Sequence, residues 1–420
     1  MNTPSNSFRI LALLGPGMLV AATGVGAGDL ATAAFTGHQL GVGIVWAVLL
    51  GAALKFVLNE GLTRWQLVTG QTLLEGAMLR LGWSAKIIFA IYFVLWSYFV
   101  GSALISACGA AGHAIFPVFA DAITGKRAFG IAHSLAGLVL VLVGGFRLFE
   151  SLMRVAISVM FVTVVATAVC IAPDWMAVGK GLVTPQIPPT ADGTGLDWTL
   201  ALIGGVGGTL TILCYGYWIR EKGREDIAAL PACRIDLAVA YGFTAIFGIA
   251  MVIIGSTIHI EGRGAQLIVA LADRLGDILG PTGRWLLLAG IWAALFSSLL
   301  GVWQAVPYLF ADFWQLLRHN EPAKVNTQNR SYRGYLLLLA TVPMLGLFRD
   351  FKQVQLIYSI FGSFFLPLLA LALLILNGQV AWVGKYRNHP VTIGLLLATL
   401  AIFLVIAAPK TWVAVRLLLG

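Results

Sequence analysis

GPGMLVAATGVGAGDLATAAFTG, at residues 15–37, is the stretch of this sequence that decides the fold. It is longer than the roughly 20 apolar residues that a helix needs to cross a membrane, and its only charged residue is Asp29. Glycine disfavours a helix interior by about 1 kcal/mol relative to alanine, so the cluster around Gly26 favours unwinding there. Unwound backbone persists at membrane depth only where it is packed in protein or lines a cavity. The stretch therefore predicts a membrane helix that is broken near its middle, beside a carboxylate.

The whole chain has the composition of a polytopic membrane protein. Of its 420 residues, 59% are apolar and 11% are charged, and the mean hydropathy is +0.90. A soluble protein carries about 25% charged residues, so no water-soluble fold can hide this much apolar surface. This excludes a soluble enzyme, a nucleic-acid-binding domain and a disordered scaffold. The expected partners are membrane lipid and a small ion or solute, and the oligomeric state stays open.

No catalytic or cofactor motif accompanies the apolar segments. The sequence lacks HExxH and GxSxG, and its four cysteines form no CxxC or CxxH pair. We therefore expect that the protein is not an enzyme and holds no cofactor. A non-transporting membrane protein, either a receptor or an intramembrane enzyme, stays as a third class behind the two transporter functions considered below.

Eleven apolar segments are long enough to be candidate spans. Their approximate limits are 9–34, 40–62, 86–108, 128–146, 153–173, 198–219, 236–259, 284–313, 334–348, 354–377 and 390–409. A cytoplasmic N-terminus places 16 Lys and Arg residues in inside segments and 10 in outside segments, and basic residues accumulate on the cytoplasmic side. We expect a multi-pass protein of the inner (plasma) membrane with its N-terminus in the cytoplasm.

A connection rich in Pro and Gly, PQIPPTADGTGLD at 185–197, divides these spans into five, five and one. Repeats with an odd number of spans lie in the membrane with opposite topologies, which is the arrangement of inverted-repeat transporters. We therefore expect a single transmembrane transporter domain over residues 1–420. Its first repeat covers about 9–173, its second about 198–377, and the extra helix about 390–409.

The first span of the second half repeats the glycine signal. It contains GGVGG at 204–208, in the position that corresponds to the cluster at 23–29. Paired Gly-interrupted segments in matching positions point to the binding site of a transporter, and an intramembrane carboxylate is functional by default. Close helix packing through small residues is the alternative. We expect substrate-binding residues at both breaks: Thr23, Gly26, Ala27, Asp29, Gly207, Gly208, Cys214 and Tyr215.

Three stretches resemble the Nramp (natural resistance-associated macrophage protein) metal transporters. The stretch at 15–37 resembles their first helix, WAVLLGAALKFVLNEGLTRWQLVTGQTL (46–73) their second, and GGFRLFESLMRVAISVMF (144–161) the start of their fifth. The resemblance covers most of the chain at the level of the span pattern. It implies an all-α membrane protein with the LeuT-like inverted-repeat fold, helices 1 and 6 broken, and transport by alternating access.

The sequence departs from the Nramp pattern at the first helix break. The family carries Asp-Pro-Gly-Asn there, and the aligned residues are Gly26, Ala27, Gly28 and Asp29. The metal-binding Asp of the family is therefore replaced by Gly26, whereas its Asn has become Asp29.

Further departures lie in the third and sixth helices. The Met-Pro-His of the sixth helix aligns with Thr211, Ile212 and Leu213, and the Asp and Glu on the proton route align with Leu95 and Tyr98. The polar position of the tenth helix falls near Ser359, which joins the expected substrate-binding residues with Thr211. The chain looks like a divergent branch that lacks the metal and proton signatures of the family.

The ligands that remain favour a hard cation. A thioether selects softer metals, whereas the Asp29 carboxylate, the Thr23 and Thr211 hydroxyls and unwound carbonyls offer only oxygen, which suits an ion such as magnesium. We expect transport of a divalent cation, magnesium or manganese, with Asp29 and Thr211 as metal ligands. Cys214 would add softness if it faces the site, although it is more commonly a small buried hydrophobe. Ser297 and Ser298 offer further mid-span hydroxyls, which commonly bond back to their own helix.

The alternative is a transporter of a small organic solute on the same fold. Free amides at helix breaks suit a carboxylate, and Tyr215 could line an organic pocket. Lys55 lies in the second span as a candidate charge partner, and if it neutralises Asp29 the cation interpretation weakens. Glu60 is the other candidate partner or coupling residue, and its spacing from Arg64 also favours a structural ion pair.

Overall fold

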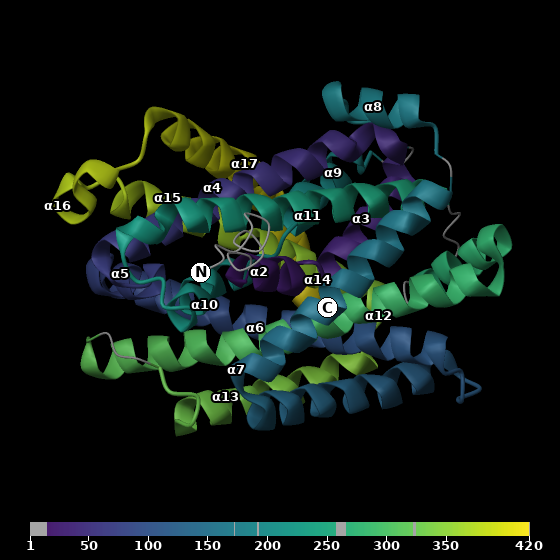
Figure 1. Ribbon diagram of the computed structural model, residues 1–420, viewed down its shortest axis with the longest axis horizontal. Coiled ribbons are helices and arrows are strands. Elements are labelled where there is room, and N and C mark those ends of the chain that lie inside the picture. Colours follow the sequence, from purple (N-terminus) through teal and green to yellow (C-terminus); the bar gives the residue numbers. More distant parts are fainter. Residues whose placement is uncertain (1–14, 172, 191–192, 258–265, 322–324, 420) are drawn as a thin grey trace, which may run out of the picture.

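The protein is a bundle of helices that run largely along one long axis, as the computed structural model shows in Figure 1. The structure describes residues 15–171, 173–190, 193–257, 266–321 and 325–419. Within these helices some side chains, those of Asp29 and Ser359 included, lie outside the described part. The described ranges are almost entirely helical and contain no strand.

Residues 15–171 form six α-helices and one 3-10 turn. They are α2 (Pro16–Gly24), α3 (Ala27–Leu40), η1 (Gly41–Ile44), α4 (Val45–Thr69), α5 (Leu73–Arg80), α6 (Gly82–Ile115) and α7 (Ala122–Cys170). Helix α7 bends at Gly145, which has a φ of 62°. It therefore contains two of the predicted spans, 128–146 and 153–173.

The second half begins with α8 (Trp175–Val183), which follows α7 in the chain. The remaining elements are α9 (Gly195–Gly205), η2 (Leu210–Leu213), α10 (Cys214–Glu221), η3 (Ile227–Ala229), α11 (Leu230–Ser256), α12 (Gln266–His319), α13 (Arg330–Thr341), η4 (Val342–Phe348), α14 (Phe351–Ser363), α15 (Phe365–Leu376), α16 (Val380–Val383), η5 (Gly384–Tyr386) and α17 (Pro390–Leu419). Helix α12 bends at Gly280, where φ is 71°.

The described residues contain seven helices that are long and apolar enough to cross a membrane, or eight if one bent pair counts as a span. The described part of each of the eleven predicted segments is nevertheless largely helical. The numbers differ because α7 joins two predicted spans and because the first and tenth are each cut into two short helices. In addition, the part of the eleventh that passes as apolar helix, Pro390–Leu404, is too short to be counted as a span. Helices 1 and 6 are broken as expected, and the all-α membrane fold is confirmed. The boundaries of the two repeats stay a prediction.

The broken helices lie inside the bundle. Helix α2 packs against α7, α11 and α12, and α3 packs against α9 and α11. The outer faces are apolar as well: Val143 is 81% exposed and Val162 is 65% exposed on α7. Such a surface is stable where lipid, not water, is the surrounding solvent.

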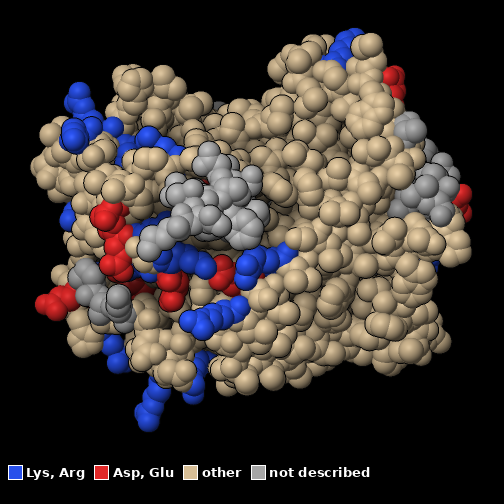
Figure 2. Space-filling model, in the orientation of Figure 1, with Lys and Arg blue, Asp and Glu red and all other residues tan. Residues whose placement is uncertain are grey.

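Charge gathers at one end of the bundle. We call the end that carries α5, α10 and α16 the basic end; it lies at the left of Figure 1. Figure 2 shows most of the visible Lys and Arg in the left half of the molecule, with a largely uncharged surface to the right of the middle. Arg64, Arg220, Arg234 and Lys385 belong to this end. The sequence assigns these residues to cytoplasmic segments, and that orientation stays a prediction.

Candidate functional site

The two helix breaks meet backbone to backbone. Val25 and Gly26 separate α2 from α3, whereas residues 206–209 separate α9 from η2, with Gly207 and Gly208 at φ of 81° and 84°. A Cβ atom at Gly24 would lie 2.7 Å from the carbonyl carbon of Gly207 and 2.9 Å from the amide nitrogen of Gly208. Neither atom can move aside as a side chain can. The glycines therefore permit both the left-handed backbone and the close approach.

Helix α12 supplies hydroxyl groups to the first break. Ser298 Oγ donates to the carbonyl oxygens of Thr23, at 2.9 Å, and Ala22, at 3.2 Å. Ser297 Oγ is 3.2 Å from the same Ala22 oxygen and 3.0 Å from Ala294 in its own helix. A Cβ atom at Gly26 would lie only 2.3 Å from Ser298 Oγ. The break is therefore held against α12 by side-chain hydrogen bonds, as buried backbone carbonyls require.

Two threonine hydroxyls flank the place where the breaks meet. Thr23 is 5% exposed, and its Oγ1 is buried with no hydrogen-bond partner among the described residues. It contacts α12 at Gly301, where a Cβ atom would lie 2.1 Å from that oxygen. Thr211 is 6% exposed, and its Oγ1 would lie 2.7 Å from a Cβ atom at Gly208. Both predicted ligands are therefore buried beside the junction, where their oxygens suit a hard cation.

Lys55 reaches the second break from α4. Its side chain is fully buried, and Nζ donates to the carbonyl oxygens of Gly204, at 2.8 Å, and of Val206. These carbonyls lie at the C-terminal end of α9, where a helix leaves carbonyls unpaired and its dipole is negative. The structure thus places a positive charge at the end of the half-helix. The predicted pairing of Lys55 with Asp29 stays untested, because the Asp29 side chain lies outside the described part.

Tyr215 and Cys214 are both fully buried at the start of α10. The Tyr215 hydroxyl donates to Asp236 Oδ2 at 3.1 Å, and the same oxygen accepts from the Gly17 amide at 2.9 Å and from Arg224 at 3.1 Å. Burial lowers the pKa of Arg224, but the Asp236 carboxylate and its other partners outweigh burial, and the pKa is raised overall. Asp236 therefore ties the first turn of α2 to α10, a contact that the sequence analysis missed.

The remaining predicted residues lie apart or outside the described side chains. Glu60 forms the predicted ion pair with Arg64, at 3.2 Å, and a second one with Arg234, at 2.6 Å. Ala27 begins α3, and Asp29 follows in its first turn. The side chains of Ala27, Asp29 and Ser359 are outside the described part.

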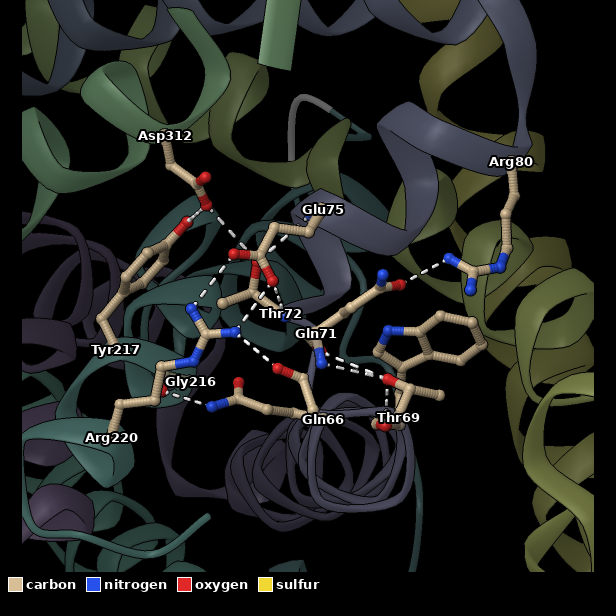
Figure 3. A network of polar contacts seen from close by, with 12 residues as sticks. Gln66, Thr69, Gln71, Thr72, Glu75, Arg80, Gly216, Tyr217, Arg220 and Asp312 are labelled. Carbon is tan, nitrogen blue, oxygen red and sulfur yellow. Dashed lines mark hydrogen bonds and ion pairs between the residues drawn. The ribbon is translucent and has the colours of Figure 1, made fainter. Parts of the chain in front are cut away.

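A second network, missed from the sequence, holds α10 at the basic end (Figure 3). Arg220 pairs with Glu75 of α5, and the Tyr217 hydroxyl donates to Asp312 of α12. Gln66 of α4 donates to the Gly216 carbonyl oxygen at 2.7 Å. Two features of the sequence could have indicated this network: the Thr72-x-x-Glu75 capping box and the carboxylate of Asp312 inside an apolar span.

The described residues contain no group of three or more His, Cys, Asp or Glu side chains that could hold a metal ion. A cation at the junction would therefore rest on hydroxyl and carbonyl oxygens, with Asp29 as the carboxylate nearest in sequence. Helix α2 ends at this junction and packs against α10. Asp236 binds both helices through Gly17 and Tyr215, and Glu75 binds α10 through Arg220. Such an arrangement can bind a small substrate between two broken helices and release it on one side.

Solved structures share this architecture. The chain superposes on a mutant of the manganese transporter of Eremococcus coleocola with a TM-score of 0.79 and 16% identity, over 100% of this chain and 90% of that one. Its TM-score with MhsT in complex with L-phenylalanine is 0.57, at 16% identity, over 95% and 98% of the two chains. These likenesses establish the LeuT-type fold.

Similar sequences cover nearly the same length. The divalent metal cation transporter MntH of Aeromonas hydrophila is 23% identical over 95% of both chains. The MntH of Xanthomonas campestris pv. campestris is 27% identical over 70% of this chain and 68% of its own. The model of the natural resistance-associated macrophage protein-like family matches residues 17–412. The chain therefore belongs to the Nramp family.

Proposed function

We propose that this protein is a secondary transporter that carries a divalent metal cation across the membrane by alternating access. The observation that carries the proposal is the meeting of two broken helices at Gly24, Gly207 and Gly208 in a chain of the Nramp family. The MntH relatives are divalent metal cation transporters, and the Eremococcus coleocola structure is that of a manganese transporter.

The site of this transporter is built from oxygen ligands. Thr23 and Thr211 bring buried hydroxyls to the junction, and Asp29 adds a carboxylate in the first turn of α3. This set suits magnesium or manganese better than a soft metal, because no thioether accompanies it.

Alternating access requires that the half-helices α2 and α10 separate from their neighbours at one end. Asp236 binds the Gly17 amide of α2, and Glu75 binds Arg220 of α10. Opening the basic end breaks these contacts, and closing the opposite end then encloses the junction. With the predicted orientation in a plasma membrane, the basic end and the N-terminus face the cytoplasm.

Ion flux into proteoliposomes tests the proposal. The wild type should show saturable uptake of manganese or magnesium under an imposed gradient, and Asp29→Ala should reduce it at least tenfold. Glu225→Ala is the matched control, because Glu225 is an exposed carboxylate between α10 and η3. Absence of metal flux in folded, reconstituted wild-type protein would exclude the metal cation as substrate.

The second candidate is a small organic solute that carries a carboxylate, and the position of Lys55 favours it. The Lys55 ammonium is buried at the second break, where it repels a metal cation and attracts an anion. In this case Asp29→Asn would spare transport of the solute, whereas it would abolish transport of a divalent cation.

A further inference from the structure

A pocket of about 410 Å³ opens at the basic end, away from the junction of the breaks. It lies between α4, α11 and the turn that joins η5 to α17. Four Lys and Arg side chains and one histidine line it, together with one carboxylate: Arg64, Arg234, Lys385, Arg387, His389 and Glu60. We call this cavity the basic pocket.

The inner wall of the basic pocket is fixed. Arg64 is 5% exposed; its Nη1 donates to the Tyr386 carbonyl oxygen at 2.6 Å and its Nη2 to Asn388 Oδ1 at 2.9 Å. Glu60 accepts from Arg64 and from Arg234, at 2.6 Å from the latter. The one carboxylate of the pocket is therefore already bound by two guanidinium groups.

The rim of the basic pocket is exposed and positive. Lys385, Arg387 and His389 are exposed, and the Arg234 side chain is 51% exposed although it contacts Glu60. Four Lys and Arg side chains face one carboxylate, so the pocket keeps an excess of positive charge. Figure 2 shows basic side chains beside α16, at the same end of the molecule.

Helix α17 adds a second feature that attracts an anion. The helix begins at Pro390, and Thr392 in its first turn lines the pocket. The N-terminus of a helix carries a partial positive charge, which attracts an anion. Pro390 has no amide N–H and the Val391 amide donates to His389 Nδ1 at 3.4 Å, so α17 contributes mainly through its dipole. The pocket thus combines guanidinium, ammonium and helix-dipole contributions.

Apolar surface adjoins the basic pocket on both flanking helices. Ile235 on α11 is 48% exposed, and Val391 and Leu397 on α17 are 65% and 52% exposed. Ile235 directly follows Arg234 in the chain and Val391 directly precedes Thr392, two residues that line the pocket. Such exposed apolar side chains suit the acyl chains of a lipid whose headgroup lies in the pocket. A free phosphate ion would leave this surface without a partner.

We propose that the basic pocket binds the phosphate-bearing headgroup of an anionic phospholipid, with the acyl chains along α11 and α17. Basic pockets between membrane helices on the cytoplasmic side recognise such headgroups. This site is separate from the transport site, and its occupation does not depend on the identity of the substrate.

The test is lipid binding to the full-length protein in a neutral detergent, measured by native mass spectrometry. The probes are dioctanoyl phosphatidylglycerol, dioctanoyl phosphatidylcholine with the same chains, and inorganic phosphate. The variant is Lys385→Gln with Arg387→Gln, and the control is Arg318→Gln with Arg330→Gln, two exposed basic residues outside the pocket. All four positions are exposed, so the thermal unfolding midpoint without lipid should match the wild type.

We expect saturable binding of phosphatidylglycerol and weaker binding of phosphatidylcholine. A basic side chain near a membrane surface contributes about fivefold in affinity, so the pocket variant should lose about 30-fold and the control should not. Equal binding of the two lipids, or wild-type affinity in the pocket variant, would overturn the proposal. Displacement of the lipid by inorganic phosphate at equal concentration would assign the pocket to free phosphate instead.

Discussion

The guanidinium group of Arg220 binds both carboxylate oxygens of Glu75, with Nη1 at 3.1 Å from Oε1 and Nη2 at 2.8 Å from Oε2 (Figure 3). Such a two-point pair is stronger and more directional than a single contact. The Glu75 side chain is 1% exposed and that of Arg220 is 23% exposed. Arg220 Nη2 also reaches the Gly70 carbonyl oxygen at 2.8 Å. Helix α10, which follows the second break, is thereby fixed to α5 and to the end of α4.

Glu75→Gln should loosen α10. Removal of one partner leaves a half-buried guanidinium without its counter-charge, which we expect to cost about 2 kcal/mol. The thermal unfolding midpoint should fall, and the buried thiol of Cys214, at the first residue of α10, should react faster with a maleimide. Peptide mass spectrometry measures that labelling rate. Glu225→Gln, at an exposed position, should change neither quantity, and an unchanged labelling rate in Glu75→Gln would show that the ion pair does not hold α10.

Gly24→Ala should disrupt the junction of the breaks. The added Cβ would lie 2.7 Å from the Gly207 carbonyl carbon, and the backbone cannot yield as a side chain would. We expect a loss of substrate flux of at least tenfold and a stability loss of about 1–3 kcal/mol from overpacking. Gly242→Ala is the matched control on α11, because a Cβ there meets nothing within 4 Å and alanine favours the helix by about 1 kcal/mol. Normal flux in Gly24→Ala would contradict a functional junction at this residue.

The sequence predicted the helices and the positions of their breaks because both are local properties. Apolar length identifies a span, and glycine clusters identify the interruptions at Gly26 and Gly207. The number of continuous helices was less predictable, since the bend at Gly145 leaves α7 as one long element. Whether a glycine breaks a helix or only bends it depends on the helices packed around it.

Contacts between distant segments could not be read from the chain. Two partners of Lys55 are backbone carbonyls about 150 residues away, and a backbone carbonyl leaves no signature in the sequence. The contact of Asp236 with the Gly17 amide spans 219 residues. Asp236 could have been noticed as a carboxylate in an apolar segment, but its partners depend on the packing of α2 against α11.

Asp236→Asn should free the first turn of α2. One carboxylate oxygen accepts from Gly17, Tyr215 and Arg224, and the side chain is fully buried. An amide removes the charge that Arg224 requires, so we expect a loss of about 2–3 kcal/mol in unfolding free energy. Chemical denaturation in detergent measures it. Asp277→Asn, at an exposed carboxylate of α12, should remain within about 0.5 kcal/mol of the wild type. Similar stabilities for the two variants would show that Asp236 does not hold α2 in place.

Lys55 decides between the two candidate substrates, because its charge acts with opposite sign on each. A divalent cation within about 10 Å of Nζ is repelled by about 3 kcal/mol at an effective dielectric constant of about 20. For a metal transporter, Lys55→Met should therefore lower the KM for manganese by at least tenfold, whereas Lys55→Arg, which keeps the charge, should leave it within about threefold. Flux into proteoliposomes over a range of manganese concentrations measures both values.

An organic solute as the substrate predicts the opposite effect of Lys55→Met. If the substrate bears a carboxylate, Lys55→Met removes an attractive charge, and manganese does not compete with the solute in either variant. Loss of the ammonium also leaves the Gly204 and Val206 carbonyls without their hydrogen-bond donor, so the unfolding midpoint of each variant must be measured beside its flux. A folded Lys55→Met protein that transports manganese with an unchanged KM would show that the ammonium only caps α9, because a charge that faced the substrate would have to change its binding.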